Sequence, residues 1–156
     1  MRKSLVIGVS TLALFAAMAV GAPLTKQRAL AIMHERHEGM EDVGNKNKIL
    51  RRELTKGSPD LGAVRAAAAV IARHSASAAH WFPPGTGPNV GKTGARPEIW
   101  QRPQDFAAKL RNFQVAAQAL NAAARAGDLG AIRARYAALG GTCKACHDPY
   151  RNEMHH

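Results

Sequence analysis

The sequence is poor in cysteine, in aromatic residues and in acidic residues. Its 156 residues include two cysteines, 5% aromatic residues, and 11 Asp and Glu against 22 Lys and Arg. No segment alternates apolar and polar residues over the length of a strand, which argues against a β-sheet protein. Beyond residue 22 no apolar run is long enough to cross a bilayer. The length suits one domain, so we expect a single helical domain without stable membrane insertion after residue 22.

The shortage of acids leaves a formal net charge of +11, or +9 without Arg2 and Lys3. Chains this basic can bind nucleic acid or other anionic surfaces. Here the basic residues occur one or two at a time, with acids among them. A solvated basic surface is therefore the favoured interpretation, and no nucleic-acid partner is expected. Docking to an acidic protein partner is the alternative.

The first 22 residues have the features of an export signal. Arg2 and Lys3 precede an uncharged, mostly apolar run over residues 4–22, as in secretory signal peptides. The competing interpretation is an uncleaved anchor, because 19 residues without a charge approach the ~20 that span a bilayer. We expect a removed signal at 1–22 and a mature domain at 23–156 that is exported to the periplasm.

Small residues offer two cleavage points in this signal. One follows Ala17-Met18-Ala19 and the other follows Val20-Gly21-Ala22. The first is favoured, because cleavage after Ala22 would place Pro23 directly behind the cut bond.

Four later segments have helical periodicity, with apolar residues at alternating steps of three and four. They begin near residues 25, 58, 103 and 128. The predicted core stripes are, in chain order, Leu30, Met33, Met40, Val43, Leu50 and Leu54; Leu61, Val64, Ala68, Ile71, Ser75, Ala78 and Phe82; Phe106, Leu110, Phe113, Ala117, Leu120 and Ala124; and Leu129, Ile132, Tyr136, Leu139, Cys143, Cys146 and Tyr150. With two short connections, this pattern predicts an all-α antiparallel four-helix bundle.

The helix ends carry recognisable signals. Ser58 is the predicted N-cap of the second helix, followed by Pro59 and Asp60 in the first turn. Gly127 is expected to end the third helix, and Asp128 to cap the fourth. Many of the stripe positions between these ends are alanine. Alanine buries little apolar area, so such a core would gain from a large buried group.

One long connection, over residues 82–102, contains eight prolines and glycines. A loop of about 20 residues in a compact domain is usually functional or disordered. Trp81 and Trp100 flank or end this stretch. They either anchor the loop or border a cofactor, and the sequence favours neither interpretation.

Both cysteines lie in one short motif, Cys143-Lys144-Ala145-Cys146-His147. A disulfide between them would close a tiny loop and remove little chain entropy, so a chemical role is the better interpretation. On a helix the two thiols and the imidazole share one face. This is the pattern of covalent c-type haem attachment, in which two thioethers fix the ring and the histidine meets the iron. We therefore predict one haem c, held through Cys143, Cys146 and His147.

Two other functions of this motif are less favoured. A structural zinc site needs four ligands, whereas the motif offers three and the chain has no second cysteine pair. A thiol-redox Cys-x-x-Cys usually accompanies a βαβ pattern, and no strand pattern is present.

Residues 143–151 (CKACHDPYR), at the end of a four-helix pattern, resemble the class II c-type cytochromes, the cytochrome c′ family. Residues 95–100 (ARPEIW) and 126–129 (AGDL) also resemble this family. The likeness covers about residues 25–152. It implies a four-helix bundle with haem attached near the C-terminal end of the fourth helix, and relatives that often form dimers.

The resemblance also implies functional residues on the first helix. In this family an arginine near the haem propionates precedes, by four positions, a Met or Leu over the distal face. Arg36 and Met40 match this spacing, and Val43 follows as in relatives. An earlier pair, Arg28 with Ile32, also fits the spacing and is less favoured. Met40 is thus a candidate distal iron ligand, with an ordinary core methionine as the alternative.

Rival distal ligands are His34, His37, His74 and His80, each interpreted as a surface or loop-edge residue, with His37 the strongest rival. His155 and His156 are interpreted as exposed tail residues. One departure from the family pattern is Pro149, which should kink or stop the helix beside the haem. Arg151 is therefore not carried over as the arginine that flanks the proximal histidine in relatives.

Two functions are consistent with these residues. The leading hypothesis is one-electron transfer between Fe(III) and Fe(II), with Met40 and His147 binding the iron. The alternative is a gas-binding protein that holds NO or CO on iron bound by His147 alone. An enzyme is not expected, because no further acid–base group accompanies the predicted site.

Overall fold

The structure is a computed structural model that describes residues 23–152. The predicted export signal at 1–22 and the terminal His155 and His156 lie outside these residues. Four long helices form the fold: α1 (Lys26–Leu54), α2 (Leu61–Ser77), α4 (Pro103–Ala126) and α5 (Leu129–Tyr150). Two short elements, the 3₁₀ turn η1 (Ala78–His80) and α3 (Glu98–Gln101), lie between α2 and α4. No strand occurs in the described part of the chain, so the all-α prediction is confirmed.

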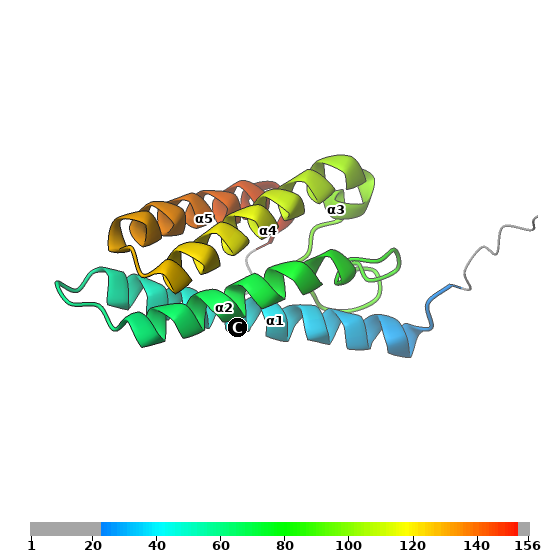
Figure 1. The fold of residues 1–156 in the computed structure, drawn as a ribbon. Helices are drawn as coiled ribbons and strands as arrows, with labels where there is room; N and C mark the ends of the chain where they lie inside the picture. Colours follow the sequence, from blue (N-terminus) through cyan, green and yellow to red (C-terminus); the bar gives the residue numbers. More distant parts are fainter. Residues whose placement is uncertain (1–22, 153–156) are drawn as a thin grey trace, which may run out of the picture.

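The long helices form an antiparallel bundle of two layers (Figure 1). α1 and α2 lie side by side in one layer, and α4 and α5 form the other, each running opposite to its chain neighbour. Contact between α2 and α4 joins the layers. The predicted four-helix bundle is therefore confirmed.

Capping side chains fix where the helices begin. Thr25 accepts a hydrogen bond from the backbone N–H of Arg28 at 3.2 Å, and Asp128 accepts from two first-turn N–H groups of α5, as predicted. The predicted Ser58 cap is wrong: α2 begins at Leu61, and the Asp60 carboxylate accepts from its first free N–H groups at 2.8 and 3.1 Å. A carboxylate at the N-terminus also meets the positive end of the helix dipole, which favours this later start.

The core is formed mainly by small and aliphatic residues. The largest fully buried apolar side chains are Leu50, Val64, Ile71, Leu120 and Ile132. Alanine supplies many of the rest, as the sequence predicted. Leu30 is an error of the predicted stripe, because it is 41% exposed. Successive side chains of an α-helix point about 100° apart around its axis. In this part of α1 the buried side chains are those of Ala29, Ile32 and Met33 instead.

The long connection is an ordered segment. The indole N–H of Trp100 donates to the carbonyl oxygens of Phe82 and Pro83 at 3.1 Å. Trp81 is 2% exposed, and its indole N–H donates to Glu35 at 3.2 Å. Both tryptophans thus anchor the connection, and neither lines the cavity described below. Of the two interpretations left open by the sequence, loop anchoring is therefore the one found. The helical stripe predicted to reach Phe82 ends earlier, because α2 stops at Ser77 and tightens into η1.

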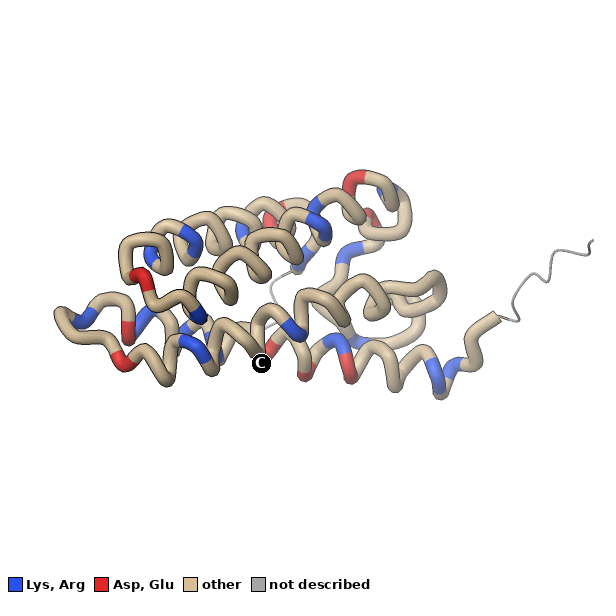
Figure 2. Tube along the Cα trace, viewed as in Figure 1, with Lys and Arg blue, Asp and Glu red and all other residues tan. Residues whose placement is uncertain are grey.

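Basic residues are spread over all four long helices (Figure 2). Along residues 23–152 they occur one or two at a time, as noted above. Among residues 23–152, no helix combines the length and the hydropathy that a bilayer crossing requires.

Candidate functional site

A cavity of about 610 Å³ opens between α1 and the α4–α5 layer. Its volume lies within the roughly 300–1,000 Å³ of small-molecule and cofactor pockets. The side chains around it include Met33, Arg36, His37, Met40 and Lys48 from α1; Phe82, Lys92 and Ala95 from the connection; Ile99 from α3; Phe106, Leu110 and Phe113 from α4; and Cys143, Cys146, His147, Tyr150 and Arg151 from or beside α5. The cavity thus brings together all five residues that the sequence predicted to bind the cofactor.

The three residues of the cysteine motif share one face of α5, as their spacing predicts. Cys143, Cys146 and His147 all line the cavity. Cys143 packs against the main core, whereas Cys146 packs against a second apolar cluster around Phe106 and Tyr150. The motif therefore presents two thiols and an imidazole to one apolar space.

The electrostatics of the thiols disfavour dithiol redox chemistry. Burial raises the pKa of Cys143, and burial with the neighbouring Cys143 raises the pKa of Cys146 to about 11. Because both pKa values are raised, both thiols are protonated at neutral pH. Reactive Cys-x-x-Cys sites instead lower a thiol pKa to stabilise the thiolate.

His147 is held in its neutral form. Burial lowers its pKa, and the positive charge of Arg151 lowers it further, against the opposing effect of Asp148. Neutral imidazole has the free nitrogen lone pair that a metal ligand needs.

The wall opposite the motif comes from α1. Met40 is half-buried and packs against the main core, and Met33, one helical turn before Arg36, is 6% exposed. Both methionines line the cavity, whereas Arg28 and Ile32 do not. The later arginine–methionine pair is thus the one that faces the motif. Met33 was predicted only as a core residue, and its place one turn from the Arg36–Met40 pair was the available signal.

Aromatic side chains form an apolar end to the cavity. The rings of Phe82 and Phe106 stack edge to face with centroids 4.8 Å apart, and Phe106 and Tyr150 do so at 5.1 Å. The Tyr150 hydroxyl donates to Asp105, which fixes this ring. The sequence placed these residues in helical stripes but gave no sign that rings from three separate segments would meet.

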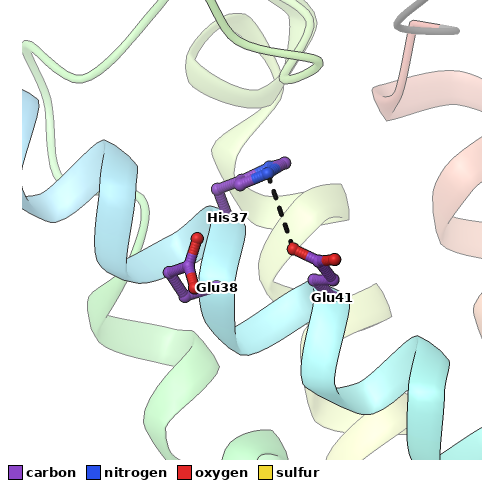
Figure 3. Close-up of side chains that lie close together, drawn as sticks. All are labelled: His37, Glu38 and Glu41. Atoms are coloured by element: carbon purple, nitrogen blue, oxygen red, sulfur yellow. Dashed lines mark ion pairs between the residues drawn. The ribbon is translucent and has the colours of Figure 1, made fainter. Parts of the chain in front are cut away.

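Of the rival histidines, only His37 lies on the cavity. His74 instead bonds Asp42 at 2.9 Å, between α1 and α2. His37 also belongs to an exposed group with Glu38 and Glu41 on α1, and its imidazole lies 3.9 Å from the Glu41 carboxylate (Figure 3). All three side chains are exposed, and we assign no metal to them.

Pro149 lies in the last turn of α5, close to the motif. The helix stops at Tyr150, and Arg151 adopts an extended backbone that pairs with Ala95. Flanking bonds run from the Arg96 N–H to the Tyr150 carbonyl at 3.0 Å and from the Asn152 N–H to the Gly94 carbonyl at 2.8 Å. The predicted stop is thus found, but Arg151 still lines the cavity and its charge reaches His147. The extended backbone returns Arg151 to the site, against our expectation.

The charged side chains around the cavity are mostly basic. Arg36, Lys48, Lys92 and Arg151 line it, and Glu41 is the one acid among the residues that do so. Such a site favours an anionic ligand, because the surrounding cations offset the cost of removing its charges from water.

A family model described as Cytochrome C′ matches residues 31–151, which include every element of the cavity. The chain belongs to the cytochrome c′ family. The predicted resemblance is thereby confirmed. Among curated relatives, cytochrome c′ of Allochromatium vinosum is 34% identical over 140 residues, covering 87% of this chain and 88% of that protein.

Solved cytochrome c′ structures share the fold. The protein from Thermochromatium tepidum gives a TM-score of 0.74 at 32% identity, covering 85% of this chain and 100% of that one. A cytochrome c′ with ligand-controlled dimer dissociation gives 0.74 at 29% identity, with the same coverage. A ferrous variant from Alcaligenes xylosoxidans with bound NO gives 0.71 at 31% identity, covering 83% and 97%.

The cavity fits the haem of a cytochrome c′. A porphyrin is flat and apolar and carries two propionates, and here aromatic and aliphatic walls are joined by basic residues at the margin. The motif supplies two neutral thiols and one neutral imidazole from a single helix face. The lining thus offers side chains of matching chemistry to the ring, the propionates and the iron of a haem.

Proposed function

We propose that this chain is a periplasmic monohaem c-type cytochrome that carries one electron. The observation that supports it most is that Cys143, Cys146 and His147 on α5 line the same cavity as Arg36 and Met40 on α1. In this proposal Cys143 and Cys146 hold one haem c through two thioethers, and His147 is the proximal ligand of its iron. Bound haem supplies the Fe(III)/Fe(II) couple.

The surrounding residues determine how this couple behaves. Phe82, Phe106 and Tyr150 exclude water from one end of the cavity, because their rings pack edge to face. Exclusion of water lowers the local dielectric and strengthens the effect of nearby charges. The basic residues at the margin then favour the reduced iron, which carries one positive charge fewer.

Met40 is proposed as the distal ligand. It lies on the wall opposite the motif and is half-buried, so its thioether is shielded from water. Ligation by Met and His keeps the iron six-coordinate and raises the reduction potential. Both properties suit electron transfer.

Binding of NO or CO is the second candidate function. A solved neighbour in the family holds NO, and the distal wall of this cavity contains two methionines and no buried hydrogen-bond donor except Arg36. In that case Met33 and Met40 would be packing residues beside a five-coordinate iron held by His147 alone.

The proposed partners follow from the same features. An acidic redox protein would complement the basic cavity margin. A homodimer is also proposed, since one structural neighbour undergoes ligand-controlled dimer dissociation. The periplasmic location is proposed from the basic and apolar pattern of residues 1–22.

Optical spectra of the ferric and ferrous protein separate the two functions. Ligation by Met40 predicts low-spin iron in both states and no CO adduct on simple mixing. A high-spin ferric spectrum, with ready CO binding by the ferrous protein, would contradict electron transfer through Met/His-ligated iron and favour gas binding.

A further inference from the structure

The terminal N–H groups of Arg36 all form hydrogen bonds within the protein. Its guanidinium donates to four oxygens of the 81–93 segment: the Trp81 carbonyl at 3.0 Å, the Thr86 hydroxyl at 3.3 Å, the Thr86 carbonyl at 3.0 Å and the Thr93 hydroxyl at 3.0 Å. The two terminal nitrogens carry four hydrogens in total, so each is used once. This leaves only the Nε–H for any other acceptor.

The four acceptors are all uncharged, although Arg36 is 5% exposed. Burial lowers its pKa to about 10, which still leaves it protonated at neutral pH. A guanidinium normally binds a carboxylate with two parallel N–H bonds. Arg36 can offer no such pair to a propionate without releasing the segment.

These bonds fix one wall of the cavity. Phe82 lies under the guanidinium, 4.9 Å from its central carbon to the ring centroid. The Thr86 hydroxyl also donates to the Pro83 carbonyl at 2.8 Å, and Thr93 also accepts from the Ala95 N–H at 3.1 Å. Arg36 thus joins both ends of the segment to α1, and the segment contributes Phe82, Lys92 and Thr93 to the cavity.

Lys92 directly precedes the clamped Thr93. It is exposed at the cavity and forms no ion pair within residues 23–152. The other charged or titratable groups facing the cavity are Arg36, His37, Glu41 and Lys48 on α1, and Cys143, Cys146, His147, Tyr150 and Arg151 on or beside α5. The guanidinium of Arg36 is engaged with the 81–93 segment, and Lys92 is the one cation that this segment itself presents to the cavity.

We propose that Arg36 is a positioning residue that clamps the 81–93 segment onto α1, and that Lys92, placed by this clamp, is the cation that pairs with a haem propionate. This inference rests on the proposed haem site. It assigns Lys92 to the cofactor and gives Arg36 an indirect role.

Limited trypsin digestion of the haem-loaded protein tests the clamp. Thr86 is 0% exposed and is not part of the Lys92–Thr93 bond, so its replacement leaves the residues at the cleavage site unchanged. Thr86→Val removes one acceptor of Arg36, and cleavage after Lys92 should become about tenfold faster. Thr86→Ser keeps the hydroxyl and should be cut at nearly the wild-type rate. Equal rates in all three proteins would overturn the clamp.

The pH dependence of the reduction potential tests Lys92. A neighbouring cation keeps a propionate ionised, so Lys92→Gln should move the redox-linked ionisation to higher pH, whereas Lys48→Gln should not. If only Lys48→Gln moves it, or if neither variant does, the assignment of Lys92 is wrong. Intact masses of all variants show whether haem is attached. A wild-type chain without haem would contradict the haem site itself, whereas haem-loaded variants that behave alike would contradict only the present inference.

Discussion

A single carboxylate, Glu53, ties the end of α1 to the start of α2. It is 2% exposed, accepts from the Lys56 ammonium at 2.7 Å, and accepts from the Asp60 N–H at 3.2 Å. Asp60 is itself the N-cap of α2. These bonds, and that of Arg52, lower the pKa of Glu53 to about 2. This role of Glu53 could not be predicted, because nothing in a local sequence pattern reveals that a turn will fold back over a charged side chain.

Glu53 should therefore make stability depend on pH. Its pKa is lower in the folded chain than its ordinary value of 4.5, so folding favours the carboxylate. That contribution is fully present above about pH 4.5 and is lost as the pH falls towards 2. In urea unfolding of the wild type and Glu53→Gln, the wild type should be more stable at pH 6, and the difference should shrink between pH 4.5 and 2. A constant difference over this range would refute the assignment.

Met40 is the residue on which the choice between functions depends. If its sulfur binds the iron, Met40→Ala should convert low-spin to high-spin iron, lower the reduction potential and allow CO to bind the ferrous protein. Met33→Leu is the matched control, because Met33 lines the same wall and should leave the spin state unchanged. Absorption spectra and a redox titration measure these changes. If Met40→Ala leaves the ferric spectrum unaltered, Met40 is only a packing residue.

Some elements of the fold could be predicted from local sequence, and others could not. The α4–α5 turn was predicted in full, since Gly127 has a φ of +83° and Asp128 caps the next helix. Periodicity also placed the cysteine motif on one helix face. The 81–102 connection could not be predicted, because its order depends on Arg36, Trp81 and Trp100 bonds between residues far apart in the chain. The same holds for the pairing of Arg151 with Ala95.

Close packing of α1 against the connection yields a prediction for Gly39. A methyl group there would lie 2.3 Å from the Trp81 ring, which is itself buried. Gly39→Ala should therefore destabilise the protein by about 1–3 kcal/mol. Gly140→Ala is the control, because nothing lies within 4 Å of that position on α5, and alanine there should stabilise by roughly 0.4–1 kcal/mol. Denaturant unfolding compares the two, and a Gly39→Ala protein as stable as the wild type would contradict this packing.

The whole molecule combines an alanine-rich core with one large cavity. Alanine buries little apolar area, and without a haem the walls of the 610 Å³ cavity would lack partner atoms. Haem-free protein should thus show less helical circular dichroism than the haem-loaded form and a broader thermal transition. A haem-free chain that is fully helical and melts cooperatively would mean that the bundle is stable without its cofactor.

Covalent attachment of one haem through Cys143 and Cys146 is the central claim, and the intact mass after acid–acetone extraction tests it most directly. The protein should be made in a host with cytochrome c maturation. Acid–acetone removes haem held only by iron ligands but leaves thioethers intact. We predict a mature chain carrying the mass of one haem, and the loss of that added mass when Cys143 and Cys146 are both replaced by Ser. A wild-type chain recovered without haem, or a double variant that retains it, would contradict the claim.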